Sequence, residues 1–364
     1  MPTLCLNMIV KNEAHVLARC LASVKPWIDS WVIVDTGSSD GTQALIREQL
    51  QGLPGQLYER PWQDFASNRS EALALARPWA SHLLFIDADE TLVAQPGTAR
   101  PELSADLYDL EMRFNGLSYL RPSLAATHLD WRYQGVLHEF LCLPEGVTWR
   151  SRMTLQGFHV EVRPEGARSR DPEKFQKDAQ VLEAALAREP GNARYAYYLA
   201  QSYRDAGALE SSLAAYRRRV ELPGWDEETW HARYQIARIL ELLGRPEPEV
   251  VHAYLAAYEA RPSRIEPLGW LARYLRLQGR FHQALIFASR ALELPPCGDL
   301  LFQEPEQRGW RCLDEFAVSA YWAGRHRESL AACDRLLTEG QLPGPERDRV
   351  EQNRAFALQA LATT

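Results

Sequence analysis

The feature that most constrains this chain is the stretch 81–90, which reads SHLLFIDADE. Residues 83–86 form an uninterrupted apolar run, which predicts a strand buried on both faces of a parallel sheet. Side chains alternate along an extended chain, so Asp87 and Asp89 face the same side beyond the carboxyl end of this strand. Open α/β sheets bind ligands at that edge. The pair predicts a site for a hard divalent cation that bridges phosphate oxygens. The alternative is an acidic turn that caps the next helix.

The residues before this stretch alternate between strand and helix patterns. Apolar runs predict strands, and apolar residues at helical spacing or capping residues predict the helices between them. The order β-α-β-α-β-α-β is typical of a parallel sheet with crossover helices. Strands are expected at 4–10, 31–34, 57–59 and 83–86, and helices at 14–24, 42–50 and 67–76.

A single carboxylate, Asp35, ends the second expected strand. It opens on the same crevice as Asp87 and Asp89, so it suits hydrogen bonding to a base or ribose, and the pair suits a metal-bound diphosphate. No Gly-x-Gly-x-x-Gly follows the first strand, and the chain has no Walker A loop. The pattern therefore predicts a nucleotide-diphosphate site without hydride chemistry.

Four sequence blocks together resemble the family 2 glycosyltransferases of the A-type fold. The blocks are MIVKNEA at 8–14, VIVDTGSSDGT at 32–42, DF with NRSEAL at 64–73 and FIDADE at 85–90. The resemblance implies a UDP-sugar donor. The residues that it implies for donor binding are Asn12, Glu13, Asp35, Arg69 and Asp87, and the alternative for Arg69 is a helix surface residue.

The same resemblance implies a bound Mn²⁺ or Mg²⁺, held by Asp89 with help from Asp87. Several A-type enzymes supply a histidine after the acceptor region as a third ligand, and His159 matches that place. An imidazole completes a carboxylate-rich shell better for Mn²⁺ than for Mg²⁺. The alternative is that His159 is a buried structural histidine.

The segment after residue 92 resembles the acceptor half of the family, with strands expected at 107–114 and 119–124. An inverting transfer needs one base to take the acceptor's proton. The resemblance places this base in the Gly-x-x-His-Glu segment, where Glu139 is the first candidate and His138 the second. The alternative is that His138 packs while Glu139 pairs with an arginine such as Arg121 or Arg132.

Residues 165–175 are polar and contain helix breakers, and the composition then changes to Ala, Leu, Arg and Glu. Helix-ending glycines recur at intervals of 37, 35 and 45 residues, close to the tetratricopeptide period of about 34. We therefore expect an α/β domain at 1–165 with a Rossmann-like, mostly parallel sheet. An all-α solenoid of tetratricopeptide-like helical hairpins follows at 166–364. The recurring glycines are Gly207, Gly244, Gly279 and Gly324.

Composition limits the partners. The formal net charge is −7 and no basic block stands out, which argues against nucleic acid. The six cysteines are scattered, which fits a reducing compartment, and no apolar stretch approaches 18 residues. We expect a cytoplasmic protein without membrane insertion, and a homodimer through the repeats is an option.

The whole arrangement is similar to bacterial tetratricopeptide-linked family 2 transferases of the sublancin S-glycosyltransferase type. The resemblance implies metal-dependent inverting transfer of a hexose from a UDP-sugar to a peptide or protein side chain, either a Ser or Thr hydroxyl or a Cys thiol. One alternative is a transferase that acts on a surface polysaccharide or another glycan. A second is an inactive, repeat-based interaction scaffold.

Overall fold

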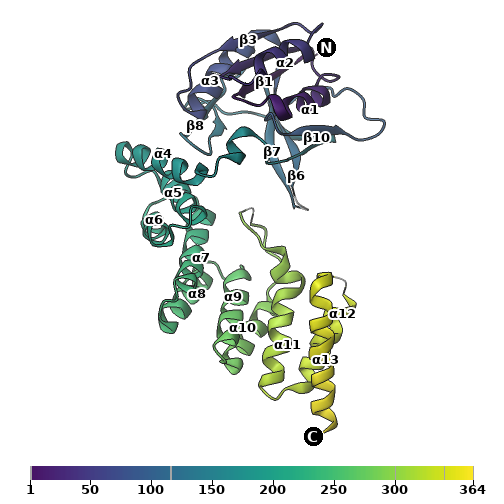
Figure 1. The fold of residues 1–364 in the computed structure, drawn as a ribbon, viewed down its shortest axis with the longest axis vertical. Helices are drawn as coiled ribbons and strands as arrows, with labels where there is room; N and C mark the ends of the chain where they lie inside the picture. The colour runs from purple at the N-terminus through teal and green to yellow at the C-terminus, as the bar shows by residue number, and fades with distance from the viewer. Residues whose placement is uncertain (1, 115–116, 300, 340, 364) are drawn as a thin grey trace. The chain divides into compact units, whose positions relative to one another are not determined.

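The computed structural model describes residues 2–114, 117–299, 301–339 and 341–363. The chain divides into two compact units, Met1–Ala185 and Leu186–Thr364. The first carries the strands and the second is built of helices, which confirms the expected fold class (Figure 1). The boundary expected at 165/166 lies inside the first unit. Among the described residues, no helix is long and apolar enough to span a membrane.

The first unit contains an eight-stranded sheet with the order β3-β2-β1-β4-β7-β6-β10-β5. Strand β1 pairs in parallel with β2 and β4, and β2 pairs in parallel with β3. The parallel half predicted from the apolar runs is thereby confirmed. Strand β7 is antiparallel to both β4 and β6. The strands are β1 Leu4–Val10, β2 Ser30–Asp35, β3 Gly55–Glu59, β4 His82–Phe85, β5 Thr91–Ala94, β6 Leu107–Phe114, β7 Leu117–Ala126 and β10 Arg152–Glu161, and β8 Arg132–Gln134 pairs with β9 Phe140–Cys142 in a separate ribbon.

Helices cover both faces of the parallel half. Apolar residues of α1 and α2 pack in one core cluster with one set of alternating β1 side chains, and α3 packs in a second cluster with the opposite set. Asp64 begins α3, because its Oδ1 accepts a hydrogen bond from the amide of Ser67 (2.7 Å). The helices of this unit are α1 Ala14–Val24, α2 Thr42–Gln49 and α3 Phe65–Ala76, with the short η1 Arg77–Trp79 and η2 Ala167–Arg170, and α4 Lys174–Arg188 crosses the boundary.

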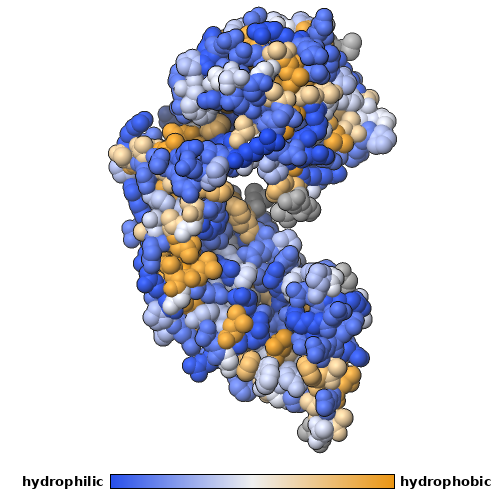
Figure 2. Space-filling view, in the orientation of Figure 1, coloured by the Kyte–Doolittle hydropathy of each residue, from blue (hydrophilic) through white to orange (hydrophobic). Residues whose placement is uncertain are grey.

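The second unit is a series of helical hairpins, as the glycine spacing predicts. Four turns between paired helices contain a glycine with φ between +63° and +78°, a backbone conformation that favours glycine. Ala200, Ala237 and Ala272 are fully buried where consecutive helices approach closely. The surface in Figure 2 is mostly hydrophilic, with apolar patches over the helices. The helices are α5 Ala193–Asp205, α6 Leu209–Glu221, α7 Asp226–Leu242, α8 Glu247–Ala260, α9 Glu266–Leu277, α10 Phe281–Glu293, η3 Gln307–Arg311, α11 Cys312–Trp322, α12 His326–Thr338, η4 Gly344–Glu346 and α13 Arg347–Ala362.

His231 on α7 is a buried titratable group in this unit. Its Nδ1 lies 2.7 Å from the hydroxyl of Tyr197, its Nε2 lies 3.1 Å from the amide of Gln235, and Phe302 stacks on its ring. Burial lowers the pKa of His231 to about 3, from the ordinary value of 6.5. Between these two pH values the unfolded chain binds a proton that the folded chain does not bind. Stability therefore falls as the pH drops through this window.

Replacing His231 with glutamine is expected to flatten the pH dependence of stability. One proton of difference corresponds to a slope of about 1.4 kcal/mol per pH unit in the free energy of unfolding. Urea unfolding between about pH 4 and pH 7 measures this slope. The exposed His282 provides the matched control, His282→Gln. Equal slopes for the two variants would contradict the role assigned to His231.

Candidate active site

Arg69 of α3 joins two of the expected site residues at the carboxyl end of β4. Its Nη2 lies 2.7 Å from Asp87 Oδ1, and its Nε lies 2.7 Å from Glu139 Oε1. The Tyr133 ring lies against the same guanidinium, 5.6 Å from its central carbon. Burial alone raises the pKa of Asp87, but the charges of Arg69 and Arg121 outweigh burial and lower this pKa to about 2. The structure thus brings Arg69, Asp87 and Glu139 into one charged cluster.

A second arginine positions the loop that carries Asp87. Arg121 on β7 makes a two-pronged ion pair with the buried Glu90 (2.8 and 2.6 Å). Glu90 Oε2 also accepts the backbone amide of Asp87 (2.9 Å), and Arg121 Nη1 lies 3.8 Å from Asp87 Oδ2. Planar bidentate pairs of this kind impose orientation as well as attraction. Neither Glu90 nor Arg121 is among the site residues that the sequence predicts. The only signal was that Glu90 directly follows the Asp-x-Asp pair.

Asp89 faces the segment that follows β10. Its Oδ2 accepts the backbone amide of Gly166 at 2.9 Å, and its carbonyl oxygen accepts from Arg19 Nη2 at 3.3 Å. A Cβ on Gly166 would lie only 2.9 Å from Asp89 Oδ2, so a side chain there would displace the Asp89 carboxylate. Burial raises the pKa of Asp89, and the neighbouring Asp87 adds to this shift.

Glu13 is tied to the same segment. Both of its carboxylate oxygens lie 3.2 Å from the backbone amide of Ala167. Glu165 pairs with Arg19 of α1 (2.7 Å), and its carbonyl oxygen lies 2.8 Å from His15 Nε2. Residues 165–167, at the start of the polar stretch 165–175, therefore contact several of the expected site residues and their neighbours.

Asp35 is almost completely buried at the end of β2. Its Oδ1 accepts the backbone amides of Gly37 and Ser38, both at 2.9 Å, and the side-chain amide of Gln43 at 3.1 Å. Its Oδ2 is buried and has no hydrogen-bond partner in the described part of the chain. A buried carboxylate oxygen without a partner is costly, so a ligand with an N–H or O–H group fits this position.

Asn12 has a different surrounding. It adopts a left-handed backbone conformation (φ 57°), and its Oδ1 accepts the backbone amide of Ser39 at 2.8 Å. The backbone amide of Asn12 donates a hydrogen bond to Ser38 Oγ, also at 2.8 Å. Asn12 thus connects the turn after β1 to the turn after β2. The second of these turns provides the backbone amides that hydrogen-bond to Asp35.

The two candidate bases lie in different surroundings. Glu139 is largely buried and pairs with Arg69, whereas His138 is exposed and has a positive φ of 52°. Glu139 does pair with an arginine, but the partner is neither Arg121 nor Arg132. Glu139 is in the charged cluster with Asp87 through Arg69.

His159 is not brought together with the Asp-x-Asp pair. It lies on β10 between Val93 of β5 and Glu111 of β6, and the charges that act on it come from Arg113, Glu161 and Glu111. Burial is the main cause that lowers its pKa. Across the described ranges, no group of three or more His, Cys, Asp or Glu side chains is arranged to hold a metal ion. The structure therefore does not assemble the expected set of three protein ligands.

Two carboxylates still suit one kind of ion. Mg²⁺ is usually bound by one or two carboxylates together with substrate phosphates and water, rather than by a complete protein cage. Asp89, with Asp87 beside it, matches this requirement when a diphosphate supplies further oxygens. The donor set thus fits a cation that arrives with a nucleoside diphosphate.

Comparison with known proteins adds to this geometry. Residues 5–94 match the family model described as Glycosyl transferase family 2, and this range contains Asp35, Asp87 and Asp89. This region is thus similar to the family 2 glycosyl transferases. The match ends in β5, so the Glu139 segment lies beyond it.

Three curated relatives each match a part of the chain. A TPR repeat-containing protein of Synechococcus elongatus is 35% identical over 145 residues (37% of this chain and 34% of the relative). The lipopolysaccharide core biosynthesis glycosyltransferase LpsC of Rhizobium meliloti is 36% identical over 100 residues (27% and 36%). An uncharacterized glycosyltransferase of Rickettsia felis is 36% identical over 86 residues (23% and 28%). Each match spans about a third of the relative's length.

Solved structures match at lower identity. MamA is 14% identical with a TM-score of 0.35, over 52% of this chain and 90% of MamA. The C-terminal part of a TPR repeat-containing protein from Cytophaga hutchinsonii is 14% identical with a TM-score of 0.41, over 52% of this chain and 68% of that chain.

Proposed function

We propose that this protein is a metal-dependent, inverting glycosyltransferase that moves a hexose from a UDP-sugar to an acceptor. One observation carries the proposal: the region similar to family 2 contains Asp35, Asp87 and Asp89, and Arg69 links Asp87 directly to Glu139. This link joins the expected donor side of the crevice to the expected base. An inactive scaffold has no need for such a buried arrangement of charges.

The donor half of the mechanism uses the ends of β2 and β4. The free Oδ2 of Asp35 is placed to accept a hydrogen bond from the uracil ring or the ribose. Asp89 and Asp87 would hold Mn²⁺ or Mg²⁺, which when bound neutralises the departing diphosphate. Arg69 holds Asp87 in its charged form and carries positive charge to the same edge of the sheet. These groups bind the donor and orient its anomeric carbon toward the acceptor.

The acceptor half uses Glu139. An inverting transfer is a direct displacement in which a base takes the acceptor's proton as the acceptor oxygen attacks the anomeric carbon. The ion pair with Arg69 (2.7 Å) keeps the Glu139 carboxyl group in a fixed orientation. In the proposed reaction, the proton passes to Glu139 and the bond to UDP breaks.

A glycan is the first candidate acceptor. One relative of the catalytic domain is named as a glycosyltransferase of lipopolysaccharide core biosynthesis. A reaction that joins one sugar to another is therefore the first to consider. A peptide or protein side chain is the second candidate. It is favoured by the helical hairpins of residues 186–364, because solenoids present extended concave surfaces.

UDP release tests the proposed function. The full chain is incubated with UDP-glucose, UDP-galactose, UDP-N-acetylglucosamine and UDP-N-acetylgalactosamine, each with Mn²⁺, Mg²⁺ or EDTA and without acceptor. We expect slow release of UDP from one donor, and loss of that release in EDTA. If no donor is hydrolysed and calorimetry detects no binding of UDP with either metal, the chain is a scaffold and the proposal is wrong.

A further inference from the structure

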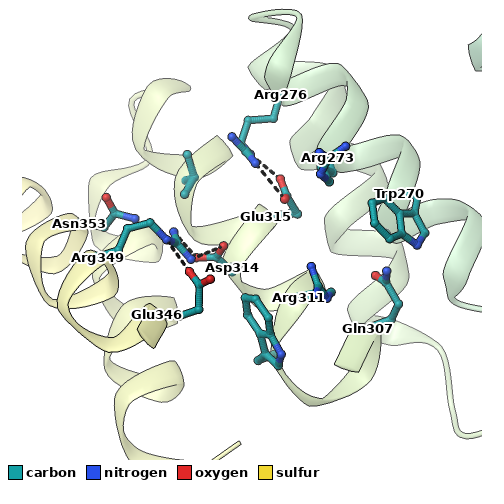
Figure 3. Close-up of a pocket in the computed structure, with 13 residues that line it drawn as sticks. Trp270, Arg273, Arg276, Gln307, Arg311, Asp314, Glu315, Glu346, Arg349 and Asn353 are labelled. Atoms are coloured by element: carbon teal, nitrogen blue, oxygen red, sulfur yellow. Dashed lines mark hydrogen bonds and ion pairs between the residues drawn. The ribbon is translucent and has the colours of Figure 1, made fainter. Parts of the chain in front are cut away.

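The second unit contains a polar hollow that the proposed chemistry does not use. It has a volume of about 380 Å³, within the usual range for small-ligand pockets. Helices α9, α11 and α13 and the short helices η3 and η4 contribute its walls (Figure 3). We call it the α9–α13 pocket. Its principal lining residues are Trp270, Arg273, Arg276, Gln307, Trp310, Arg311, Asp314, Glu315, Glu346, Arg349 and Asn353.

The charges of the α9–α13 pocket are almost balanced. Four arginines and three carboxylates line it. Figure 3 shows three ion pairs among the lining residues: Arg276 with Glu315 (2.5 Å), and Arg349 with both Asp314 (2.9 Å) and Glu346 (2.9 Å). The remaining two arginines, Arg273 and Arg311, pair with carboxylates that do not line the pocket, Glu241 (2.9 Å) and Glu306 (2.7 Å). No lining arginine carries an uncompensated charge.

This balance disfavours an anionic ligand. A phosphate or an acidic peptide gains most from an arginine fork that is free to pair with it. Here, either ligand would have to displace a carboxylate from each guanidinium and leave that carboxylate partly buried, at a cost in free energy. Glu315, the partner of Arg276, is itself buried.

A neutral polyhydroxylated ligand fits the same groups. Each hydroxyl both donates and accepts a hydrogen bond, so a sugar ring accepts from guanidinium N–H groups and donates to the free lone pairs of the carboxylates beside them. The amide side chain of Asn353 offers a donor and an acceptor group, whereas the buried amide of Gln307 already donates to Glu304 Oε2 (3.2 Å). The arginines and carboxylates of the pocket can therefore bind such a ligand without giving up their ion-pair partners.

Tryptophan provides a second, independent observation. The indole Nε1–H of Trp310 is buried without a hydrogen-bond partner among the described residues, although this side chain lines the pocket. Such a donor is costly to leave unpaired, and a ligand hydroxyl would satisfy it. Trp270 adds an aromatic surface to the wall, with Arg238 stacked on its ring at 3.3 Å.

We propose that the α9–α13 pocket binds a neutral sugar unit, and that, if the proposed function holds, this unit belongs to the acceptor glycan. The helical unit then holds the acceptor while the catalytic domain transfers the hexose. This assigns to the repeats a carbohydrate-binding role in place of a purely architectural one.

Saturation-transfer NMR and tryptophan fluorescence with the full chain test this inference. The probes are the methyl glycosides of glucose, galactose, mannose and N-acetylglucosamine. We expect at least one of them to bind saturably, with a Kd on the order of 1 mM. Arg311→Ala and Asn353→Ala should weaken this binding roughly tenfold, about 1.4 kcal/mol. The control is Arg335→Ala, because Arg335 is an exposed arginine of α12 that pairs with Glu339 outside the pocket.

Several outcomes would overturn the inference. One is the absence of saturable binding for all four glycosides, and another is glycoside binding that neither pocket variant weakens. A third is that inorganic phosphate or a poly-glutamate peptide binds and that Asn353→Ala abolishes this binding. Thermal melting checks that each variant folds, and Asn353→Ala removes no side-chain ion pair. UDP release by the unchanged protein is a separate measurement. Donor hydrolysis without glycoside binding would reject the pocket and leave the proposed function standing.

Discussion

Replacing Glu139 with glutamine is expected to lower sugar transfer by roughly 100- to 10,000-fold, the usual contribution of a positioned general base. Glutamine keeps the shape of the side chain and one oxygen that accepts from Arg69, but it takes up no proton. Donor binding should therefore stay close to that of the unchanged protein. Transfer is measured with the donor that the UDP-release experiment identifies, and donor binding is measured by calorimetry with UDP and metal.

The matched control for this variant is Glu145→Gln, an exposed glutamate in the turn that follows β9. It should transfer sugar at the unchanged rate. If Glu139→Gln loses donor binding together with transfer, Glu139 has a structural role through Arg69. Unchanged transfer in Glu139→Gln would instead exclude it as the base.

Replacing Asp89 with asparagine is expected to lower metal-dependent UDP release by roughly 100- to 1,000-fold, because a Lewis-acid metal supplies several kcal/mol to the departure of a charged group. Asparagine keeps an oxygen that accepts the amide of Gly166 but removes the negative charge that a hard cation requires. Calorimetry should show weaker binding of UDP in the presence of Mn²⁺, and little change in its absence.

The control for Asp89 is Asp130→Asn, because Asp130 is an exposed aspartate that pairs with Arg77 on the surface. Its UDP release should stay unchanged. Full metal-dependent release by Asp89→Asn would refute the metal assignment. The same variant in EDTA gives the metal-independent background against which the loss is measured.

Local sequence determined the elements of this protein. The apolar runs at 4–10 and 83–86 are sufficient to predict strands, because burial on both faces acts on each residue separately. The capping carboxylate of Asp64 and the glycines that end the repeat helices act over one helical turn. Two architectures in one chain, sheet then hairpins, followed directly from these patterns.

The placement of the charged groups was decided by the tertiary structure. Arg69 and Glu139 are 70 residues apart, and Asp89 and Gly166 are 77 apart, so no local periodicity links them. Strand β10 pairs in parallel with β6 and antiparallel with β5, and this pairing places His159 between Glu111 and Val93. A sequence pattern specifies each helix or strand and the face of that element that is buried. The partner of a long charged side chain depends on the packing of distant elements, because charges pair through space and not along the chain.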